Sequence, residues 1–378
     1  MKPRIVILGA GFGGLELATA LSETHGDSLA VTLIERSDHF VFGFSKLDVL
    51  FGKRTADAVR ISYATVVKPG VRLVRETVTA IDAANRRVTT DAGVHDADYL
   101  VIALGADYDV SQTPGVVLGD NEFYTLEGAT RMRDVVARFD RGAAVVGLCG
   151  APYKCPPAPS ECALLLHDQL EKRGVRGACS IAIVSPLSTP VPPSPETSAA
   201  LLSAFAERGI EYLASTRVVA VDRARQVIKL DNGTERPCQL FLGIPKNRAP
   251  DVVIAAGLTK DGWVTIDPHT LETPFAGVWA IGDLANTGAP KAGVFSEVAA
   301  TTVAANIGAL VRGETPTAKY PGSGSCYIEL GAERIARVDV DFFSGPKPTG
   351  RFYPPSIALR ADKEQFATTR RARWFGQR

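Results

Sequence analysis

The chain has 378 residues, a hydrophobic content of 46% and a net charge of +1, so it is longer than most single domains and we expect two or three folding units. The balance of 42 basic against 41 acidic residues excludes the strongly basic footprint of a nucleic-acid-binding protein. No apolar run in the sequence approaches the ~20 residues that span a bilayer.

A strand, a glycine-rich turn, a helix and a second strand open the chain. We expect them at residues 4–8, 9–14, 15–23 and 29–35, which together make a complete βαβ unit. The first apolar run stops after four residues and is much shorter than the apolar core of a secretory signal. We therefore expect a cytoplasmic protein, with peripheral attachment to the inner face of the membrane left open.

The turn has the spacing of a dinucleotide-binding fingerprint. Its glycines are Gly9, Gly11, Gly13 and Gly14. Glycine is needed there for a tight bend, for close approach of the backbone to a pyrophosphate and for packing of the helix on the strand, and the phosphates would lie at the helix N-terminus. Glu35 ends the next strand and can accept hydrogen bonds from the adenosine ribose, with Arg36 beside it as a further contact. The turn alone is compatible with NAD and with FAD.

Strand patterns continue after this unit. Residues 78–90 alternate as strand residues do. Residues 99–106 form a short apolar strand that runs into glycine, as in a sheet buried on both faces. We expect Ala103 and Gly105, at the end of that strand, to contact the cofactor.

A second, altered copy of the βαβ unit follows. Its strand, helix and strand are expected at residues 143–147, 160–173 and 180–184. Clusters of proline and glycine near residues 186–195, 243–250 and 344–355 predict loops or junctions.

Residues 273–283, Thr-Pro-Phe-Ala-Gly-Val-Trp-Ala-Ile-Gly-Asp, resemble the second FAD motif of flavoproteins with two dinucleotide-binding domains. The resemblance implies FAD as the cofactor, held by Gly282 and by the Asp283 carboxylate on the ribityl hydroxyls. It also implies that Lys291, ahead of a helix expected at 295–310, approaches the pyrimidine edge of the flavin. A cation and a helix N-terminus there would stabilise the anion of the reduced flavin. The alternative for Lys291 is an ordinary solvated lysine.

These motifs predict an α/β fold with two Rossmann-like dinucleotide-binding domains, similar to glutathione reductase, and a small C-terminal α+β domain. The FAD-binding domain is expected at residues 1–110 and 250–318. A degenerate NAD-binding-like domain is expected at 111–249, and a C-terminal domain with a possible acceptor or membrane contact at 319–378. In the second domain, bulky residues and prolines at 147–161 stand where phosphate needs bare backbone. We infer that NAD(P)H binding there is weak or absent.

The segment 152–161, Pro-Tyr-Lys-Cys-Pro-Pro-Ala-Pro-Ser-Glu, resembles the active-site signature of the flavocytochrome c sulfide dehydrogenase and sulfide:quinone oxidoreductase family. The resemblance implies that Cys155 is half of a redox-active disulfide. Its partner would be Cys326, in Ser-Gly-Ser-Cys-Tyr-Ile. Sulfide or another small sulfur compound would attack the disulfide and leave a persulfide on Cys155. Cys326 would then add to the flavin ring and pass on two electrons, which go to a quinone or a c-type cytochrome.

The residues themselves favour thiol chemistry at this segment. A cysteine among four prolines is held rigidly, and with a pKa lowered beside Lys154 it would serve as nucleophile or leaving group in disulfide exchange. Glu161 matches the acid of the family and is the expected proton acceptor. The alternatives are that Cys155 and Cys326 are unconnected reduced thiols, and that Glu161 only favours the dipole of its helix.

This chain departs from the family in several places. No cysteine precedes Cys149, so the covalent flavin link of the flavocytochrome enzymes is not expected and FAD should be noncovalent. Cys149 and Cys162 do not fit the disulfide pair, although either could act as a relay thiol, and Ser160 stands where an aromatic residue is usual. Cys179 and Cys238 are expected to serve packing. No cysteine pair has the spacing of a zinc site, so no metal is expected.

The tail predicts a contact with the acceptor or the membrane. Residues 360–378 contain six basic and two acidic residues together with Phe366, Trp374 and Phe375, which suits an anionic bilayer surface. A solvated basic terminus is the alternative. Quinone is preferred to cytochrome because the chain is expected in the cytosol, and Phe342–Phe343 is a candidate lining of a quinone pocket.

Two other functions are compatible with the sequence. An NADH:quinone reductase or NADH-dependent disulfide reductase would use the second nucleotide site. A non-catalytic redox-sensing flavoprotein would govern a protein partner through its redox state. Bleaching of the flavin by NADH favours the first, and absence of turnover with any acceptor favours the second.

Overall fold

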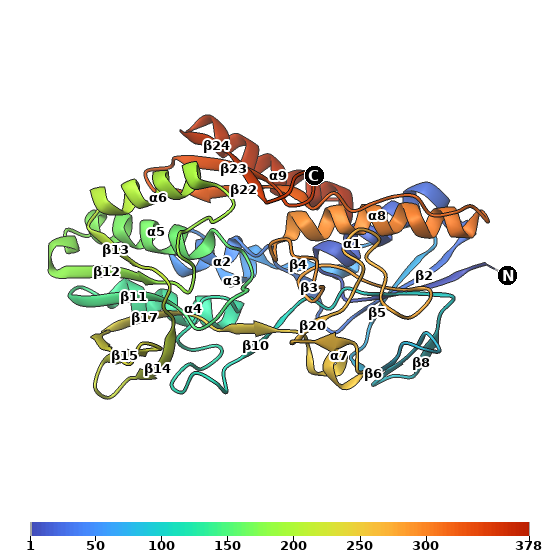
Figure 1. The fold of residues 1–378 in the computed structure, drawn as a ribbon, viewed down its shortest axis with the longest axis horizontal. Helices are drawn as coiled ribbons and strands as arrows, with labels where there is room; N and C mark the ends of the chain where they lie inside the picture. The colour runs from blue at the N-terminus through green and yellow to red at the C-terminus, as the bar shows by residue number, and fades with distance from the viewer. Residues whose placement is uncertain (1, 378) are drawn as a thin grey trace.

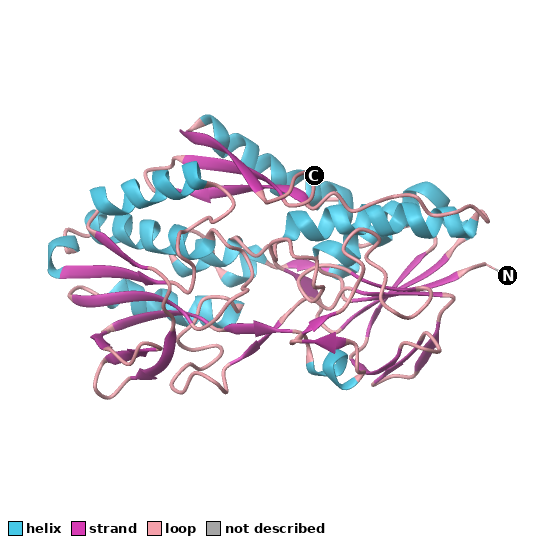
Figure 2. Cartoon of the chain, viewed as in Figure 1, coloured by secondary structure: helices cyan, strands magenta, loops and turns pink. Residues whose placement is uncertain are grey.

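Two parallel sheets lie side by side in the computed structural model, which describes residues 2–377. A smaller antiparallel sheet and the last helix lie above them in the view of Figure 1. Helices cover the sheets of both halves (Figure 2). The predicted α/β fold class, with two Rossmann-like halves and a C-terminal α+β unit, is confirmed. The domain boundaries stay a prediction.

The first parallel sheet is assembled from two distant parts of the chain. Its strands, in spatial order, are β21 (Val278–Ala280), β9 (Tyr99–Ile102), β1 (Arg4–Leu8), β2 (Ala30–Glu35) and β5 (Val71–Arg75). Because β9 pairs with both β1 and β21, the ends of these three strands meet at one edge of the sheet. The glycine-rich turn and the segment after residue 280 therefore come together there.

Different layers cover the two faces of this sheet. Helices α1 (Phe12–His25) and α8 (Gly293–Val311) pack against each other on one face. The antiparallel strands β6 (Val78–Asp82), β7 (Arg87–Thr90) and β8 (Val94–Asp96) cover the other. Alternate residues of β1 separate the layers, since Ile5 packs with the helices and Val6 with the hairpins. The alternating pattern at residues 78–90 thus corresponds to β6 and β7, which are joined by a turn.

Among the described residues, α8 is one helix whose length and composition would allow it to cross a membrane. Most of its apolar window, 61%, is buried inside the protein. Its packing on α1 identifies it as a core helix of the first half.

The second parallel sheet carries the altered βαβ unit. Its strands, in spatial order, are β13 (Ile210–Leu213), β12 (Cys179–Val184), β11 (Gly142–Leu148) and β17 (Leu240–Ile244). Its helices are α4 (Leu126–Arg138), α5 (Ala158–Lys172) and α6 (Pro195–Glu207), and an antiparallel sheet of β14 (Val218–Asp222), β15 (Val227–Leu230) and β16 (Glu235–Pro237) packs beside it. Strands β10 (Asp107–Asp109) and β18 (Lys246–Arg248) pair between the two halves (Figure 1). The predicted junction at 243–250 thus contains the end of β17 and the short strand β18.

The C-terminal unit consists of β22 (Ser323–Glu329), β23 (Ile335–Asp341), β24 (Thr349–Ser356) and α9 (Ala358–Phe375). The loop or junction predicted near 344–355 is wrong for most of that range, because residues 349–355 belong to strand β24. Within residues 2–377 this strand pairs with β23 alone, and an edge strand tolerates Pro354 and Pro355, which lack a backbone donor. Helix α9 contacts β23, β24 and α1, so it links the C-terminal sheet to the first half.

The remaining short elements lie in connecting segments. They are α2 (Ser45–Leu50), α3 (Ala56–Val59), α7 (Asp251–Ala255), β3 (His39–Phe40), β4 (Ile61–Ser62), β19 (Thr259–Lys260) and β20 (Trp263–Val264).

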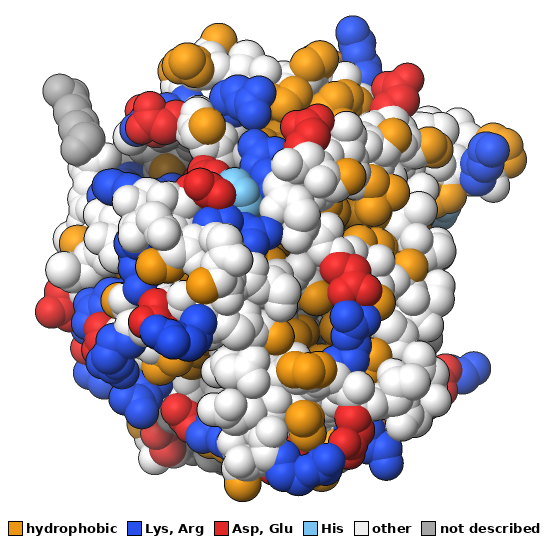
Figure 3. Space-filling model, turned by 90° about the vertical axis from the view of Figure 1, so that its left-hand side faces the viewer, with side chains coloured by type: hydrophobic (Ala, Val, Ile, Leu, Met, Phe, Trp, Pro, Cys, Tyr) orange, Lys and Arg blue, Asp and Glu red, His pale blue; other side chains and the backbone are white. Residues whose placement is uncertain are grey.

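The end of the molecule formed by the second half carries charges of both signs. Figure 3 shows acidic side chains among the lysines and arginines of this face. In this half Arg236 Nη2 lies 2.6 Å from Glu211 Oε2, and Arg225 Nη2 lies 2.6 Å from Glu235 Oε2. Such exposed pairs contribute little to stability, but they neutralise the basic side chains locally.

Candidate active site

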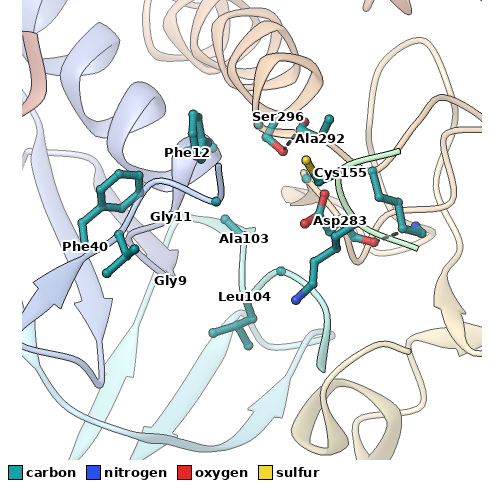
Figure 4. Close-up of a pocket in the computed structure, with 18 of the residues that line it drawn as sticks. Gly9, Gly11, Phe12, Phe40, Ala103, Leu104, Cys155, Asp283, Ala292 and Ser296 are labelled. Atoms are coloured by element: carbon teal, nitrogen blue, oxygen red, sulfur yellow. Dashed lines mark hydrogen bonds between the residues drawn. The ribbon is translucent and has the colours of Figure 1, made fainter. Parts of the chain in front are cut away.

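A cavity of about 630 Å³ runs from the glycine-rich turn to the segment that precedes α5. Figure 4 shows Gly9 and Gly11 at one end and Cys155 and Asp283 at the other. The carboxyl ends of β1, β9 and β21 meet at this cavity, which is the edge where open parallel sheets bind their ligands. Side chains from both halves and from the C-terminal sheet line it.

The glycine-rich turn presents bare backbone to the cavity. Gly9 has φ +94°, and a Cβ there would lie 2.5 Å from Ala103 O. A Cβ on Gly14 would lie 1.8 Å from Gly9 O, so the turn closes only with glycine. A Cβ on Gly11 would meet nothing within 4 Å and would project into open space. No side chain caps the N-terminus of α1, so its amides remain available to a phosphate.

Glu35 braces the same turn. Its Oε2 accepts a hydrogen bond of 2.9 Å from Ala10 N, and its Oε1 accepts one of 2.9 Å from Ser37 N. A carboxylate oxygen can accept two hydrogen bonds, so each oxygen of Glu35 can also accept one from a ribose hydroxyl. Glu35 and Arg36 line the cavity, as do Ala103 and Gly105 at the end of β9.

Asp283 supplies an acceptor that the protein leaves unused. Its Oδ1 is buried and has no hydrogen-bond partner. Burial raises its pKa, while Lys154 and Lys291 favour the carboxylate. An unpaired buried acceptor costs free energy, and hydroxyl donors of a bound ligand would offset that cost. Gly282, with φ +81°, sets the bend that aims Asp283 into the cavity.

Lys291 lies at the cavity wall, and its ammonium is held by the protein itself. Nζ donates a hydrogen bond of 2.6 Å to Asp283 O and lies 3.6 Å from the centre of the Trp263 ring. Burial lowers the pKa of Lys291 to about 8. Lys291 is therefore not an ordinary solvated lysine, and it braces the loop that carries Asp283. Its contact with a flavin edge stays a prediction.

Cys155 and Cys326 face the same cavity from different parts of the fold. Cys155 precedes α5, and Cys326 lies in the middle of β22. Cys155 N donates a hydrogen bond of 2.8 Å to Lys291 O, which places the thiol beside the Asp283 loop. Cys155 also has φ +54°, an uncommon conformation for a non-glycine residue and typical of functional sites. Both cysteines are free thiols in this structure.

The predicted lowering of the Cys155 pKa is wrong for this dithiol form. Burial raises the pKa of Cys155, and the nearby Glu161 and Cys326 raise it further. Burial raises the pKa of Cys326 to about 12. Lys154 gives Cys155 no help, because its Nζ donates to Ala106 O at 2.6 Å and lies over the Tyr108 ring.

Glu161 lies in the first turn of α5, beside both thiols. Its side chain is 3% exposed, and its Oε1 accepts a hydrogen bond of 2.9 Å from Glu329 N. Burial raises the pKa of Glu161 to about 7, and the Lys363 ammonium at 3.8 Å opposes that shift. A carboxyl group with a pKa near neutrality can both accept and release a proton there.

The sequence analysis missed Lys363, Glu329 and Phe12. Lys363 and Glu329 approach Glu161 from α9 and β22, and no spacing in the sequence links the three. Phe12 lies at the glycine-rich turn and packs edge-on against Trp374, 5.4 Å between ring centres. The position of Phe12 between Gly11 and Gly13 was the only feature of the sequence that could have predicted its contact with Trp374.

Two aromatic side chains of the tail are buried against the first half. Trp374 and Phe375 are 1% and 2% exposed, so the prediction that they face a bilayer is wrong. Trp374 Nε1 donates a hydrogen bond of 2.8 Å to Glu16 Oε2, and Arg373 Nη2 lies 2.8 Å from Glu16 Oε1. Burial of the two aromatic rings removes apolar surface from water and so stabilises the contact between α9 and the first half.

Other predicted positions lie away from the cavity wall. Cys149, Cys162, Cys179 and Cys238 are buried and do not line it. The Phe342 ring packs on Phe295, and the Phe343 ring packs on His269 and Tyr320. Ser160, at the position where an aromatic residue is usual, is also buried.

The altered second turn is built around Cys155. Residues 149–157 separate β11 from α5, and Glu161 puts a negative charge in the first turn of that helix. A carboxylate there disfavours a bound phosphate. A Cβ on Gly147 would lie 2.4 Å from the Phe241 ring, so this glycine serves internal packing. Weak or absent NAD(P)H binding stays a prediction.

The fold and the cavity define a flavin-dependent oxidoreductase with two dinucleotide-binding-type halves and a thiol pair at the far end of the cofactor cavity. The chain belongs to the pyridine nucleotide-disulphide oxidoreductase family, whose model matches residues 3–308.

Three comparisons describe what the chain is similar to. The mitochondrial sulfide:quinone oxidoreductase of Mus musculus is 26% identical in an alignment 372 residues long, which covers 92% of this chain and 80% of that protein. The X-ray structure of the sulfide:quinone oxidoreductase from Aquifex aeolicus superposes with a TM-score of 0.88 at 23% identity, covering 99% of this chain and 92% of that one. The type II NADH:quinone oxidoreductase of Staphylococcus epidermidis (strain ATCC 35984) is 35% identical, but over 117 residues, 30% of this chain and 28% of that protein.

Proposed function

We propose that the protein is a sulfide:quinone oxidoreductase, which oxidises sulfide or another small sulfur compound at a Cys155–Cys326 pair and passes two electrons through FAD to a quinone. One observation carries the proposal. Two cysteines that are 171 positions apart line one cavity with Asp283 and the glycine-rich turn. The similarity to sulfide:quinone oxidoreductases over nearly the whole chain supports it.

The sulfur step uses the two thiols in their oxidised form. Hydrosulfide attacks Cys155 Sγ, the bond between the two cysteines breaks, and a new sulfur–sulfur bond leaves a persulfide on Cys155. Cys326 departs as a thiolate that holds the electron pair of the broken bond. Glu161 accepts the proton of the persulfide, since its carboxylate lies beside both sulfurs. When bound, FAD supplies the two-electron acceptor for this site.

FAD fits the residues present. The open space at Gly11 suits the pyrophosphate, and the unpaired Asp283 Oδ1 suits the ribityl hydroxyls. We propose noncovalent binding, because no cysteine precedes Cys149 in the sequence. Precipitation of the protein in acid should release all flavin into the supernatant, and flavin that stays in the pellet contradicts noncovalent binding.

A second groove offers the acceptor a separate approach. It has a volume of about 900 Å³ and lies between α8, α9 and the C-terminal sheet. Its wall shares Val294, Ser325, Tyr327 and Phe366 with the cofactor cavity. An aromatic side chain between two openings suits stacking with a quinone ring. A c-type cytochrome is the alternative acceptor.

Anaerobic mixing tests the proposal. Sulfide should bleach the flavin, a soluble quinone should restore its colour, and NADH should do neither. Bleaching by NADH alone would instead support the NADH:quinone oxidoreductase activity named for the staphylococcal relative. If cytochrome c, and not quinone, reoxidises the reduced flavin, the electron acceptor is a cytochrome and the proposal of a quinone is wrong.

A further inference from the structure

A chain of charged side chains continues from Glu161 to the surface. Lys363 Nζ on α9 lies 3.8 Å from Glu161 Oε1 and 2.7 Å from Glu329 Oε1 on β22. Lys53 Nζ, after α2, lies 3.1 Å from the other oxygen, Glu329 Oε2. Three elements of the fold, α5, α9 and β22, and the turn after α2 therefore place charges of alternating sign in a row that starts beside the two thiols.

The inner members of this network are withdrawn from water. The side chains of Glu161, Lys363 and Glu329 are 3%, 15% and 17% exposed. An ion with so little solvent is retained only when opposite charges and hydrogen bonds compensate it. Removing one partner leaves the others uncompensated, so the state of Glu161 depends on Lys363.

Resting on the proposed function, we infer that Lys363 is the positioning residue of the sulfur site. Its ammonium holds the Glu161 carboxylate ionised beside Cys155 and Cys326, so that Glu161 takes the persulfide proton. Glu329 keeps Lys363 in place, and Lys53 balances the outer oxygen of Glu329. Helix α9 thus completes the sulfur site.

The charges around Glu161 support this assignment. Lys363 is the main cation that favours the Glu161 carboxylate, against burial and Glu329, which disfavour it. Lys363 also acts on the thiol, because its charge lowers the pKa of Cys155. The pKa of Lys363 is raised by Glu161 and Glu329 despite its burial, so the ammonium stays charged through neutral pH.

Several ionisable groups surround Glu161 and affect how its protonation depends on pH. The groups that face it or its immediate partners lie on several elements. They are Lys363 on α9, Glu329 and Cys326 on β22, Asp339 on β23, Cys155 before α5, Lys46 and Asp48 on α2, and Lys53 after α2. The thiols are neutral near pH 7, since burial raises their pKa values. Burial and the Glu329 charge raise the pKa of Asp48, and Lys53 and Lys363 oppose that shift. Lys363 is therefore the charge whose removal moves the Glu161 titration most.

Substitution of Lys363 tests the inference through the pH profile. The rate at which sulfide bleaches the flavin is measured from pH 5.5 to 9.5 in wild type, Lys363→Met and Lys363→Arg. If loss of the cation raises the Glu161 pKa from about 7 by about one unit, Lys363→Met is about tenfold slower at pH 6 and close to wild type at pH 9.5. Lys363→Arg keeps the charge and should restore most of the rate. Ionisation of sulfide itself affects every variant equally and cancels in the ratio.

Arg360→Met is the matched control on the same helix. Arg360 is 47% exposed and pairs with Glu333 and Glu364, away from the sulfur site. Its loss perturbs the surface of α9 and should leave the pH profile unchanged. In a Glu161→Gln background Lys363→Met should cause no further change in the acid limb, because the group through which it acts is gone.

A second readout needs no turnover. In the reduced protein the rate of alkylation of Cys155 by iodoacetamide follows its thiolate, and Lys363→Met should move that titration to higher pH. If sulfide does not bleach the wild-type flavin, the proposed function fails while this alkylation shift still tests Lys363. If wild type is bleached and Lys363→Met keeps both the wild-type profile and the wild-type alkylation curve, the inference is overturned.

Discussion

The backbone amide of Cys155 donates a hydrogen bond of 2.8 Å to the carbonyl of Lys291. Lys154 forms a parallel bridge with the same residue. The side chain of Lys291 in turn donates to Asp283 O at 2.6 Å. The thiol segment of the second half and the Asp283 loop of the first half are therefore one hydrogen-bonded unit. A ligand held by Asp283 would meet Cys155 in a position that the backbone sets.

Substitution of either cavity cysteine should separate cofactor binding from sulfur chemistry. In Cys155→Ser and Cys326→Ser the flavin should stay bound, and its bleaching by sulfide should slow by on the order of 10³-fold or more, because the covalent route is lost. Stopped-flow absorbance measures the rate. Cys162→Ala removes a buried thiol that does not line the cavity and should keep most of the wild-type rate. Equal losses in all three variants would refute a specific pair.

Two glycines of the turn should respond differently to alanine. Gly11 has φ −75° and its added Cβ would meet only open space, so Gly11→Ala should leave the free energy of unfolding of the apoprotein within about 0.5 kcal/mol of wild type. The methyl group would occupy the expected pyrophosphate space, and the flavin content should fall. Gly14→Ala forces a Cβ to 1.8 Å from Gly9 O and should destabilise the apoprotein by about 3 kcal/mol.

Urea unfolding of the apoproteins and flavin absorbance of the purified proteins check this pair. The same response from both variants would mean that the space at Gly11 is not a ligand site.

The unpaired oxygen of Asp283 predicts that the cofactor, not the fold, needs this carboxylate. Asp283→Ala removes a buried oxygen that has no hydrogen-bond partner among the described residues, and this gain is offset by the loss of its favourable charge interaction with Lys154 and Lys291, so the apoprotein should stay within about 1 kcal/mol of wild type. The flavin should dissociate more readily, by about tenfold or more in Kd, since hydrogen bonds to a charged acceptor are lost. Fluorescence of released flavin measures Kd. An apoprotein that unfolds more easily would show a structural role instead.

The sequence alone predicted those parts of the candidate site that are formed by short continuous motifs. The turn around Gly11, the Asp283 motif and the Cys155 segment are each continuous in sequence, because their chemistry depends on neighbouring residues. The partners of Glu161 come from three distant elements, and only the packing of α9 brings Lys363 to it. The prediction for Trp374 was wrong because the composition of a basic tail with aromatic residues is the same whether its rings contact a membrane or pack inside the protein. Burial likewise reversed the expected shift of the Cys155 pKa.

The raised pKa of Glu161 predicts a specific dependence of stability on pH. Its pKa is about 7 in the folded protein and 4.5 in the unfolded reference, so the folded state holds more protons between these values. The stabilisation from the protonated form is complete below pH 4.5 and is lost as the pH rises through 7. Glu161→Gln keeps a neutral side chain, so the difference in unfolding free energy between wild type and variant should change in that window. If the difference in unfolding free energy between wild type and Glu161→Gln does not change from pH 4.5 to 7.5, the pKa of Glu161 in the folded protein is near its ordinary value.

Trp374 should connect the end of α9 to cofactor retention. It is 1% exposed, and its ring lies 5.4 Å from Phe12 and 5.8 Å from Phe40 between centres. Trp374→Ala removes a large buried side chain and should lower the free energy of unfolding by about 3–5 kcal/mol. Because Phe12 belongs to the glycine-rich turn, the flavin should also dissociate faster. Ile357→Ala, at a residue 70% exposed beside the start of α9, should change neither quantity.

Urea unfolding and flavin release at one protein concentration measure both effects of Trp374→Ala. A large loss of stability with unchanged flavin retention would mean that the aromatic contact holds α9 but does not reach the cofactor turn. An unchanged unfolding free energy, together with loss of binding to anionic vesicles, would return this side chain to the membrane-facing role that the composition of the tail suggested.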